Sequence, residues 1–194
     1  SPNLLSDMST KDKILASLFS SVTARTAGFN TIDTASLTSS SKLLTVALMF
    51  IGGSPGSTAG GMKTTTLAVL TATAVSVFRR NENPELFRRR IAPETVANAA
   101  SILMMYLSLC LTGAFLISRI EELPMMACMF ETASAVGTVG LSFGITPGLG
   151  SISRIILIIL MYLGRVGGLT LIYAALSGHR IRFGKYPLEK ITVG

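Results

Sequence analysis

Charged side chains are scarce in this 194-residue sequence. They make up 14% of the residues, whereas 49% are hydrophobic and the mean hydropathy is +0.57. An average soluble domain carries roughly 25% charged residues. So few surface-forming side chains argue against a freely soluble globular domain, and the high hydrophobic content argues against disorder. We therefore expect an integral membrane protein.

Histidine and cysteine are nearly absent, with one His and two Cys in the whole sequence. A single His excludes His pairs and His-based metal clusters. Cys110 and Cys128 lie in apolar runs and form no CxxC motif, which is typical of buried free thiols. The sequence offers no Ser/His/Asp or Cys/His nucleophile set, so we do not expect an enzyme. The net charge of +7 does not indicate nucleic-acid binding, because the basic residues lie between apolar segments.

Long apolar segments are what the sequence does contain. The segment 95–118 has 24 residues without a charge, about 36 Å of helix and enough to cross a bilayer core of about 30 Å. The segment 152–177 is a second candidate helix. A third, 43–78, is interrupted by the Gly-rich stretch 52–63. We expect a broken helix there, with irregular backbone that must be buried in protein or line a watery cavity.

Two shorter apolar segments, 13–23 and 124–135, have 11 and 12 residues. Segments of this length are more often re-entrant than membrane-spanning. Each is followed by a Gly-containing stretch, 26–30 and 138–142 respectively. We therefore expect two short helices that enter the membrane and end in turns.

Basic residues set the expected orientation. Five arginines lie in the loop 79–94, and the tail 179–194 is also basic. Because basic loops tend to stay in the cytoplasm, we expect this loop and the C-terminus to be cytoplasmic and both turns to face outward.

The sequence also repeats itself. At an offset of 112 residues, ten identities occur in the 31 columns from Thr26 to Gly56, among them Thr26 with Thr138 and Gly28 with Gly140. The unit is a short helix, a Thr-x-Gly turn and a helix with a glycine break. The helix 95–118 precedes the second copy, and its counterpart in the first would end near residue 6. We therefore expect the sequence to be part of a longer polypeptide.

Outward turns held by short helices are typical of ion selectivity filters, in which backbone carbonyls replace the hydration shell of a cation. Glycine permits the backbone angles that such a run of carbonyls needs. The TVG at 138–140 is similar to the core of K⁺-channel filters. Packing turns in a transporter are the alternative. The predicted filter residues are Thr26, Ala27, Gly28, Phe29, Thr138, Val139, Gly140 and Leu141.

The stretch 52–63 predicts a flexible polar loop beneath the filter. It is close to a phosphate-binding loop, but Met62 breaks that pattern and the flanks are apolar. Arg165 lies in the equivalent break of the second copy, where it would hold the loop or place a positive barrier below the filter. Arg25 and Glu131 lie beside the two turns, either as an ion pair or as local caps. The predicted gate residues are Gly52, Gly53, Ser54, Gly56, Ser57, Thr58, Gly60, Gly61, Lys63 and Arg165.

These motifs resemble the Trk/Ktr/HKT superfamily of K⁺ transporters. The resemblance covers nearly the whole chain. It is carried by SSVTARTAGFNTID at 20–33, MFIGGSPGSTAGGMKTTT at 49–66, ETASAVGTVGLS at 131–142, GRVGGLTL at 164–171 and the closing KYPLEKITVG. The closing segment is similar to the tail of the bacterial Ktr-type membrane subunit.

The resemblance implies an all-α integral membrane fold, with membrane–pore–membrane repeats, re-entrant pore helices and broken second membrane helices. Residues 1–78 would be a partial third repeat and 95–178 the fourth, so the N-terminal repeats of the pore would be missing. Gly28 and Gly140 match filter glycines that favour K⁺, 52–63 matches an intramembrane gating loop and Arg165 an arginine below the filter. The resemblance leaves open whether Na⁺ couples to or activates transport.

The implied location is the cell membrane, inner or plasma, with several passes. The implied partners are a second copy of the chain and a cytosolic nucleotide-binding regulatory subunit. A filter ring needs about four loops and this chain supplies two, so we expect the chain alone not to conduct. Two other hypotheses remain at this stage: a secondary transporter of another small solute, with broken helices at the membrane midplane, and a non-conducting membrane fragment.

Overall fold

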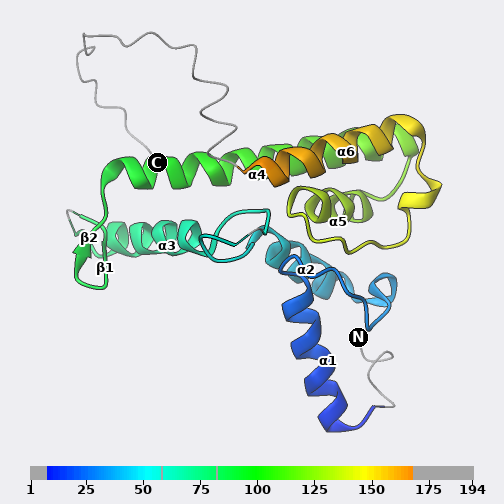
Figure 1. The fold of residues 1–194 in the computed structure, drawn as a ribbon, viewed down its shortest axis with the longest axis horizontal. Helices are drawn as coiled ribbons and strands as arrows, with labels where there is room; N and C mark the ends of the chain where they lie inside the picture. The colour runs from blue at the N-terminus through cyan, green and yellow to red at the C-terminus, as the bar shows by residue number, and fades with distance from the viewer. Residues whose placement is uncertain (1–7, 58, 82, 168–194) are drawn as a thin grey trace.

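The structure is a computed structural model that describes residues 8–57, 59–81 and 83–167 (Figure 1). In chain order its elements are α1 (Thr10–Thr23), η1 (Thr34–Ser36), α2 (Ser39–Phe50), α3 (Thr64–Phe78), β1 (Glu85–Leu86), β2 (Arg89–Arg90), α4 (Pro93–Glu121), α5 (Met125–Val136), η2 (Thr146–Gly148) and α6 (Ser151–Val166), where η marks a single 3₁₀ turn. The described residues are thus mainly helical. The antiparallel hairpin of β1 and β2, within the predicted loop 79–94, was not predicted.

α4 is the longest element, and it contains the predicted helix 95–118. Its 29 residues span about 43 Å. It begins with Pro93 and Glu94, residues that suit the first turn of a helix, and it ends at Glu122 in the left-handed conformation. Within the described ranges, it is the one helix long and apolar enough to cross a membrane.

The predicted broken helix 43–78 is two helices in the structure. α2 has 12 residues and α3 has 15, and the loop 51–63 separates them. Thr38 caps α2 by accepting a hydrogen bond from the backbone N–H of Ser41. The predicted helix 152–177 begins as α6, which ends at Val166, where Gly167 has a φ of 89°. The remainder of that predicted helix lies outside the described residues, as does the tail 179–194.

The core surrounds α5. Helices α2, α4 and α6 all pack against it, and every residue from Phe130 to Val136 is buried. Two apolar clusters meet there, one centred on Tyr106 and Ile117 of α4 with Leu160 of α6, the other on Met49 of α2 with Phe130. In contrast, α1 projects away from this layer of helices (Figure 1), and among its residues only Thr23 is buried.

The 112-residue offset of the sequence also relates the elements of the structure. Moving by 112 residues places Thr34–Ser36 on Thr146–Gly148, and the start of α2 at Ser39 on the start of α6 at Ser151. α1 and α5 end one residue apart on the same scale. Both copies therefore run helix, turn, 3₁₀ turn and helix in the same order.

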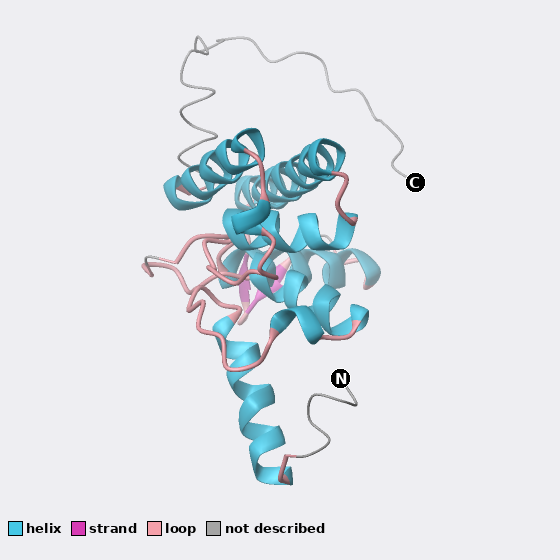
Figure 2. Cartoon of the chain, turned by 90° about the vertical axis from the view of Figure 1, so that its right-hand side faces the viewer, coloured by secondary structure: helices cyan, strands magenta, loops and turns pink. Residues whose placement is uncertain are grey.

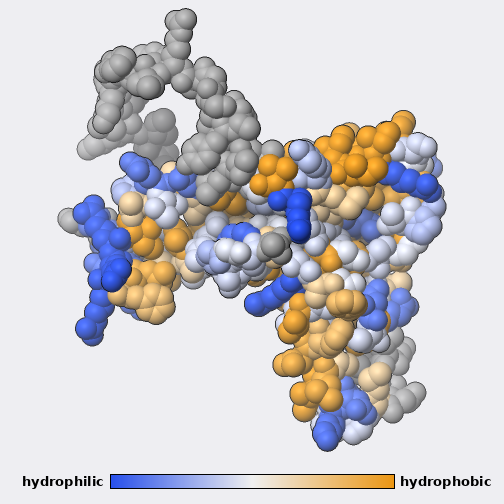
Figure 3. All heavy atoms as spheres, in the orientation of Figure 1, coloured by the Kyte–Doolittle hydropathy of each residue, from blue (hydrophilic) through white to orange (hydrophobic). Residues whose placement is uncertain are grey.

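The loops of the two copies gather on one side of the chain, between α1 and the paired long helices (Figure 2). Exposed apolar side chains cover α1 and the outer face of α6, while a cluster of hydrophilic side chains marks the end with the hairpin (Figure 3). Such extensive apolar surface is what a membrane or a further protein element would cover.

Candidate functional site: two adjoining turns and the loop beneath them

The Thr-x-Gly turns after α1 and α5 share one unusual backbone conformation. Thr26 and Thr138 have φ values of 64° and 53°, and Gly28 and Gly140 have φ values of 74° and 89°. A β-branched residue in the left-handed region is a genuine outlier that costs of order 1–3 kcal/mol. The same outlier at the same repeat position indicates that the fold, rather than chance, holds this shape.

The two turns lie directly against each other. A Cβ added to Gly28 would collide with the carbonyl oxygen of Val139, and a Cβ added to Gly140 would lie 3.8 Å from the Cα of Gly28. Backbone therefore meets backbone, and glycine at position 28 is required for this approach as well as for its φ. The structure brings together Gly28 and Gly140, two of the predicted filter residues, which the repeat alone could only align.

Buried neighbours hold the second turn more firmly than the first. Val139 and Leu141 are both 3% exposed, whereas Phe29 of the first turn is 71% exposed. The hydroxyl of Thr23 donates to the carbonyl of Phe29 over 2.6 Å. That of Thr34 crosses between the copies and donates to the carbonyl of Ser142, also over 2.6 Å. Neither threonine was among the predicted site residues.

Glu131 is the main brace of the second turn. Its carboxylate is buried and accepts three hydrogen bonds, from Ser142 Oγ at 2.7 Å, from the Phe143 backbone N–H at 2.9 Å and from Thr146 Oγ1 at 2.9 Å. An ionised carboxylate accepts without donating, so it suits three donors. Of the two roles left open for Glu131, the structure shows the local cap, while Arg25 is exposed.

Aromatic packing extends this brace. The ring of Phe143 stacks on that of Phe130 with centroids 3.8 Å apart, and the ammonium of Lys42 lies 4.8 Å from the Phe143 centroid. Lys42 belongs to the first copy, so this cation–π contact is a second link between the copies.

The loop 51–63 is folded and closed at its base. The Gly52 N–H donates to the carbonyl of Met62 at 2.8 Å, and the Met62 N–H donates to the carbonyl of Phe50 at 3.1 Å. The Lys63 ammonium then donates to the carbonyls of Ser57 at 3.0 Å and Ala59 at 2.6 Å. Lys63 thus holds the far part of the loop back over its own base.

One contact ties this loop to the second turn. The N–H of Gly60 donates to Thr138 Oγ1 at 3.0 Å, and a Cβ at Gly60 would collide with the Thr138 side chain. Gly61 also approaches the Cα of Gly137, since a Cβ built there would lie 3.6 Å away. The loop therefore lies directly against the turn, with its glycines at the points of closest approach.

Arg165 lies near this loop at the end of α6. It is exposed, and it lines a cavity of about 610 Å³ together with Gly56, Ser57, Gly60 and Lys63. The preceding residue, Gly164, packs so closely on the backbone of Val136 that a Cβ would collide with it. Of the other predicted gate residues, Gly53 lies beside Ser57 within the loop, Ser54 accepts a backbone hydrogen bond from Ser57, and Thr58 lies outside the described residues.

Within the described ranges, no group of three His, Cys, Asp or Glu side chains is placed to hold a metal ion. Backbone carbonyls and hydroxyls predominate at the turns, and such hard oxygen ligands suit alkali cations better than transition metals.

The chain belongs to the TrkH family of cation transport proteins, whose family model matches residues 2–180. It is 39% identical over 189 residues to the potassium/sodium uptake protein NtpJ of Enterococcus hirae. This alignment covers 94% of this chain and 42% of that protein. It is 37% identical over 193 residues to the Ktr system potassium uptake protein B of Bacillus subtilis, over 100% of this chain and 43% of that protein.

Among solved structures, the fold is similar to that of the potassium transporter TrkH from Vibrio parahaemolyticus, with a TM-score of 0.73 and 23% identity. The match covers 88% of this chain and 39% of that one. These comparisons confirm the family resemblance found in the motifs. The chain spans less than half the length of the relatives it matches.

Proposed function

We propose that this chain supplies two of the filter turns of a K⁺-translocating membrane pore. The observation that carries the proposal is the pair of Thr-x-Gly turns, which share one left-handed conformation and adjoin at Gly28 and Val139. Family membership and the potassium uptake named in the relatives support K⁺ as the transported ion. Backbone carbonyls around Thr26–Phe29 and Thr138–Leu141 replace the ion's hydration shell.

Electrostatics favour a cation at these turns. α1 and α5 both end at a turn, so the negative end of each helix dipole is directed toward it. The buried carboxylate of Glu131 adds a negative charge behind the second turn. Together these groups lower the energy of a partly dehydrated cation without offering it a side-chain ligand.

The loop 51–63 acts as the gate. Its Gly60 is hydrogen-bonded to Thr138 of the filter, and its Lys63 bends the loop back on itself. Arg165 borders the same cavity and places a second positive charge beside the path. Opening moves the loop off Thr138 and exposes the filter to the cytoplasmic side.

The pore operates in the cell membrane with the loop 79–94 and the C-terminus in the cytoplasm. A ring of about four turns is needed to surround the ion, so this chain works with further repeats or with a second copy. A homodimer and a cytosolic nucleotide-binding regulatory subunit complete the proposed assembly. The sodium named in one relative makes Na⁺ a candidate coupling or activating ion.

The test is ion selectivity. Gly28→Ser and Gly140→Ser each place a side chain where the backbone must curve, and in the assembled pore each should weaken discrimination against Na⁺. Uptake of Rb⁺ and Na⁺ by cells or vesicles measures the ratio. A serine at Gly148, which has open space around it, is the control. Unchanged selectivity in both filter variants would rule out the filter assignment.

A further inference from the structure

A groove separate from the turns runs along α3 toward the hairpin. Its volume is about 690 Å³. Residues of α3 from Thr64 to Ser76 line it, Arg79 follows at the end of the helix, and Glu85, Leu86 and Arg88 border the far end. The proposed ion path uses none of these residues. The groove therefore raises the question of what it holds.

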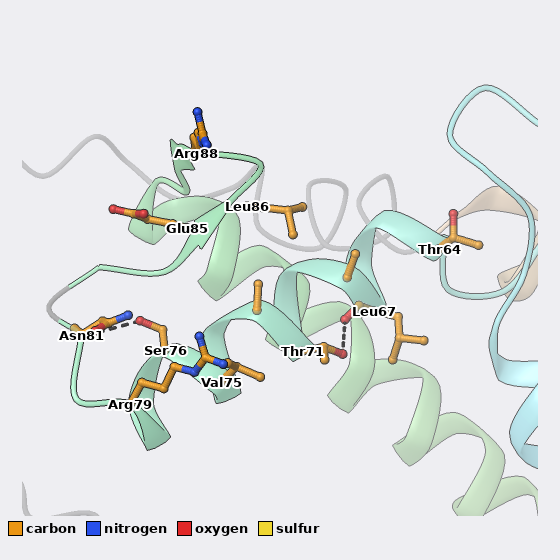
Figure 4. Close-up of a pocket in the computed structure, with 12 residues that line it drawn as sticks. Thr64, Leu67, Thr71, Val75, Ser76, Arg79, Asn81, Glu85, Leu86 and Arg88 are labelled. Carbon is orange, nitrogen blue, oxygen red and sulfur yellow. Dashed lines mark hydrogen bonds between the residues drawn. The ribbon is translucent and has the colours of Figure 1, made fainter.

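The wall of the groove along α3 is mostly apolar. Leu67, Ala68, Ala72 and Val75 recur at spacings that place them on one side of the helix, and Leu86 reaches over from β1 (Figure 4). From Thr64 to Val75 this wall is about 16 Å long. Thr64, Thr71 and Ser76 interrupt this wall with hydroxyls, but the apolar side chains form a strip long enough for an extended alkyl chain.

The end of the groove near the hairpin is basic. The side chain of Arg79 turns back along α3 beside Val75, and Arg88 stands at the outer rim (Figure 4). Glu85 also borders the groove, so its lining carries two positive charges and one negative charge. The whole segment 79–94 has five arginines and three glutamates. This excess of arginine over glutamate favours an anionic group at this end of the groove, close to the apolar wall.

The position of the basic end matches a membrane surface. α3 starts at the proposed gate, and its 15 residues extend about 22 Å from there, which is enough to reach the cytoplasmic interface. Phe78 and Phe87, which are next in sequence to the lining residues Arg79 and Arg88, are 86% and 91% exposed. Exposed apolar rings beside arginines combine the two surfaces that meet where lipid borders water, since arginines near helix ends reach toward the interface. Figure 3 shows the hydrophilic cluster and apolar surface side by side at this end of the chain.

We propose that this groove binds a phospholipid with an anionic headgroup from the cytoplasmic leaflet. The headgroup phosphate pairs with Arg79 and Arg88, and one acyl chain lies along Leu67, Ala72 and Val75. Neither part alone specifies the ligand; apolar length and positive charge in one groove select an amphiphile of this kind. The proposal rests on the proposed insertion in the membrane with the loop 79–94 on the cytoplasmic side, but not on the assignment of the filter.

The experiment measures lipid that remains with the protein. The full chain is produced in bacterial membranes and extracted with its surrounding lipid into polymer nanodiscs. Phosphatidylglycerol and phosphatidylethanolamine per protein are then measured by mass spectrometry and compared with the bulk membrane. We expect phosphatidylglycerol to be enriched around the native chain.

Two double variants with the same change in charge distinguish lipid binding in the groove from general attraction of anionic lipid to basic residues. Arg79→Gln with Arg88→Gln should lower the enrichment by roughly fivefold or more, because it removes both cations that line the groove and would pair with the headgroup phosphate. Arg89→Gln with Arg90→Gln is the matched control, because both residues are exposed on β2 and neither lines the groove. The control should keep the enrichment.

The apolar wall has its own test. Ala72→Trp obstructs the middle of the apolar wall without changing charge and should also reduce the enrichment, with circular dichroism showing whether the helix content is kept. Equal loss in the two arginine pairs, no enrichment around the native chain, or full enrichment in a folded Ala72→Trp variant would each overturn the proposal. Because the readout is bound lipid rather than ion flux, its failure is separate from failure of the filter.

Discussion

The two copies of the repeat have the same turn in very different surroundings. α5 is enclosed by α2, α4 and α6, and its turn is anchored by the buried carboxylate of Glu131. α1 projects from the rest, with Ile14, Leu15 and Leu18 each more than half exposed. Its turn is anchored by the hydroxyl of Thr23. The position equivalent to Glu131 in the first copy is Phe19, which has no acceptor to offer.

This contrast separates what makes the turn from what supports it. Thr26 and Thr138 reach the left-handed region in both settings, so the Thr-x-Gly motif and the contact between the turns suffice for the shape. The support differs by copy, since one copy uses a buried charge and the other a single hydroxyl. The second turn should therefore be the stiffer one, and the first the one that depends more on whatever covers α1.

The largest expected change in K⁺ flux comes from the glycine breaks, which differ between the copies. The first copy has the long loop 51–63, and the second has a short break from Gly164 to Gly167 that contains Arg165. Deleting residues 54–60 should raise K⁺ flux several-fold in the assembled pore, because it removes the segment that contacts Thr138. Arg165→Ala should act in the same direction. Rb⁺ uptake measures both. A deletion variant that inserts normally but shows equal or lower flux would mean that the loop is not the gate.

A milder variant checks the same contact. Thr138→Val keeps the shape of the side chain but removes the hydroxyl that accepts from Gly60, so it should increase flux less than the deletion does. Thr138→Ser keeps the hydroxyl and should retain native flux.

The next largest effect, on stability and ion selectivity, is expected from removing Glu131, the carboxylate that only the second copy has. Glu131→Ala removes the acceptor from three partly buried donors, those of Ser142, Phe143 and Thr146, at up to about 1–3 kcal/mol for each group left unsatisfied. We expect lower thermal stability in nanodiscs together with poorer K⁺/Na⁺ discrimination. Glu131→Gln keeps an acceptor for the Phe143 N–H and should lose much less stability.

Glu121 provides the control for the two Glu131 variants, because it is a second carboxylate that accepts hydrogen bonds. It accepts from the Gly150 N–H at 2.8 Å and from Ser153 Oγ at 2.6 Å, away from the turns. Glu121→Ala should lower stability without changing selectivity. If it alters selectivity as much as Glu131→Ala does, the brace has no special part in the filter.

A smaller difference in stability is expected between alanine variants of the two turn glycines, Gly28 and Gly140. Alanine at either position has an unfavourable positive φ, which costs about 1–2 kcal/mol. Gly28→Ala also collides with the carbonyl of Val139, whereas Gly140→Ala meets only the Cα of Gly28 at 3.8 Å. We expect Gly28→Ala to be clearly less stable in a thermal denaturation assay. Equal losses would show that the turns do not adjoin as described.

The smallest effect belongs to the anchor of the first turn. Thr23→Val removes one hydrogen bond to Phe29 and should cost about 1 kcal/mol, with a slight loss of selectivity. Thr23→Ser keeps the bond and serves as control. A loss as large as that of Glu131→Ala would mean that the two turns are supported equally.

Local sequence patterns predict the helices and turns, but not the side-chain contacts that hold the turns in place. The repeat and the apolar segments placed 95–118, the break at 52–63 and the Thr-x-Gly turns, because each depends on residues close in sequence. The role of Glu131 remained ambiguous, since its partners lie 11 to 15 residues away. The bonds of Thr34 and Lys42 across the copies, and the hairpin with Phe87 and Arg88 at positive φ, depend on packing that periodicity does not encode. The assignment of filter and gate remains a prediction.

The hydrogen bond from Thr34 to Ser142 has a consequence for biogenesis. Its partners are 108 residues apart, and a ribosome adding about 5–20 residues per second needs roughly 5–20 s to pass from one to the other. During that interval the first turn has already been translated but lacks both this bond and the backbone of Val139 to rest on. The nascent first copy therefore remains without these two contacts until the second copy has been made, and a pause in translation between them would lengthen that interval.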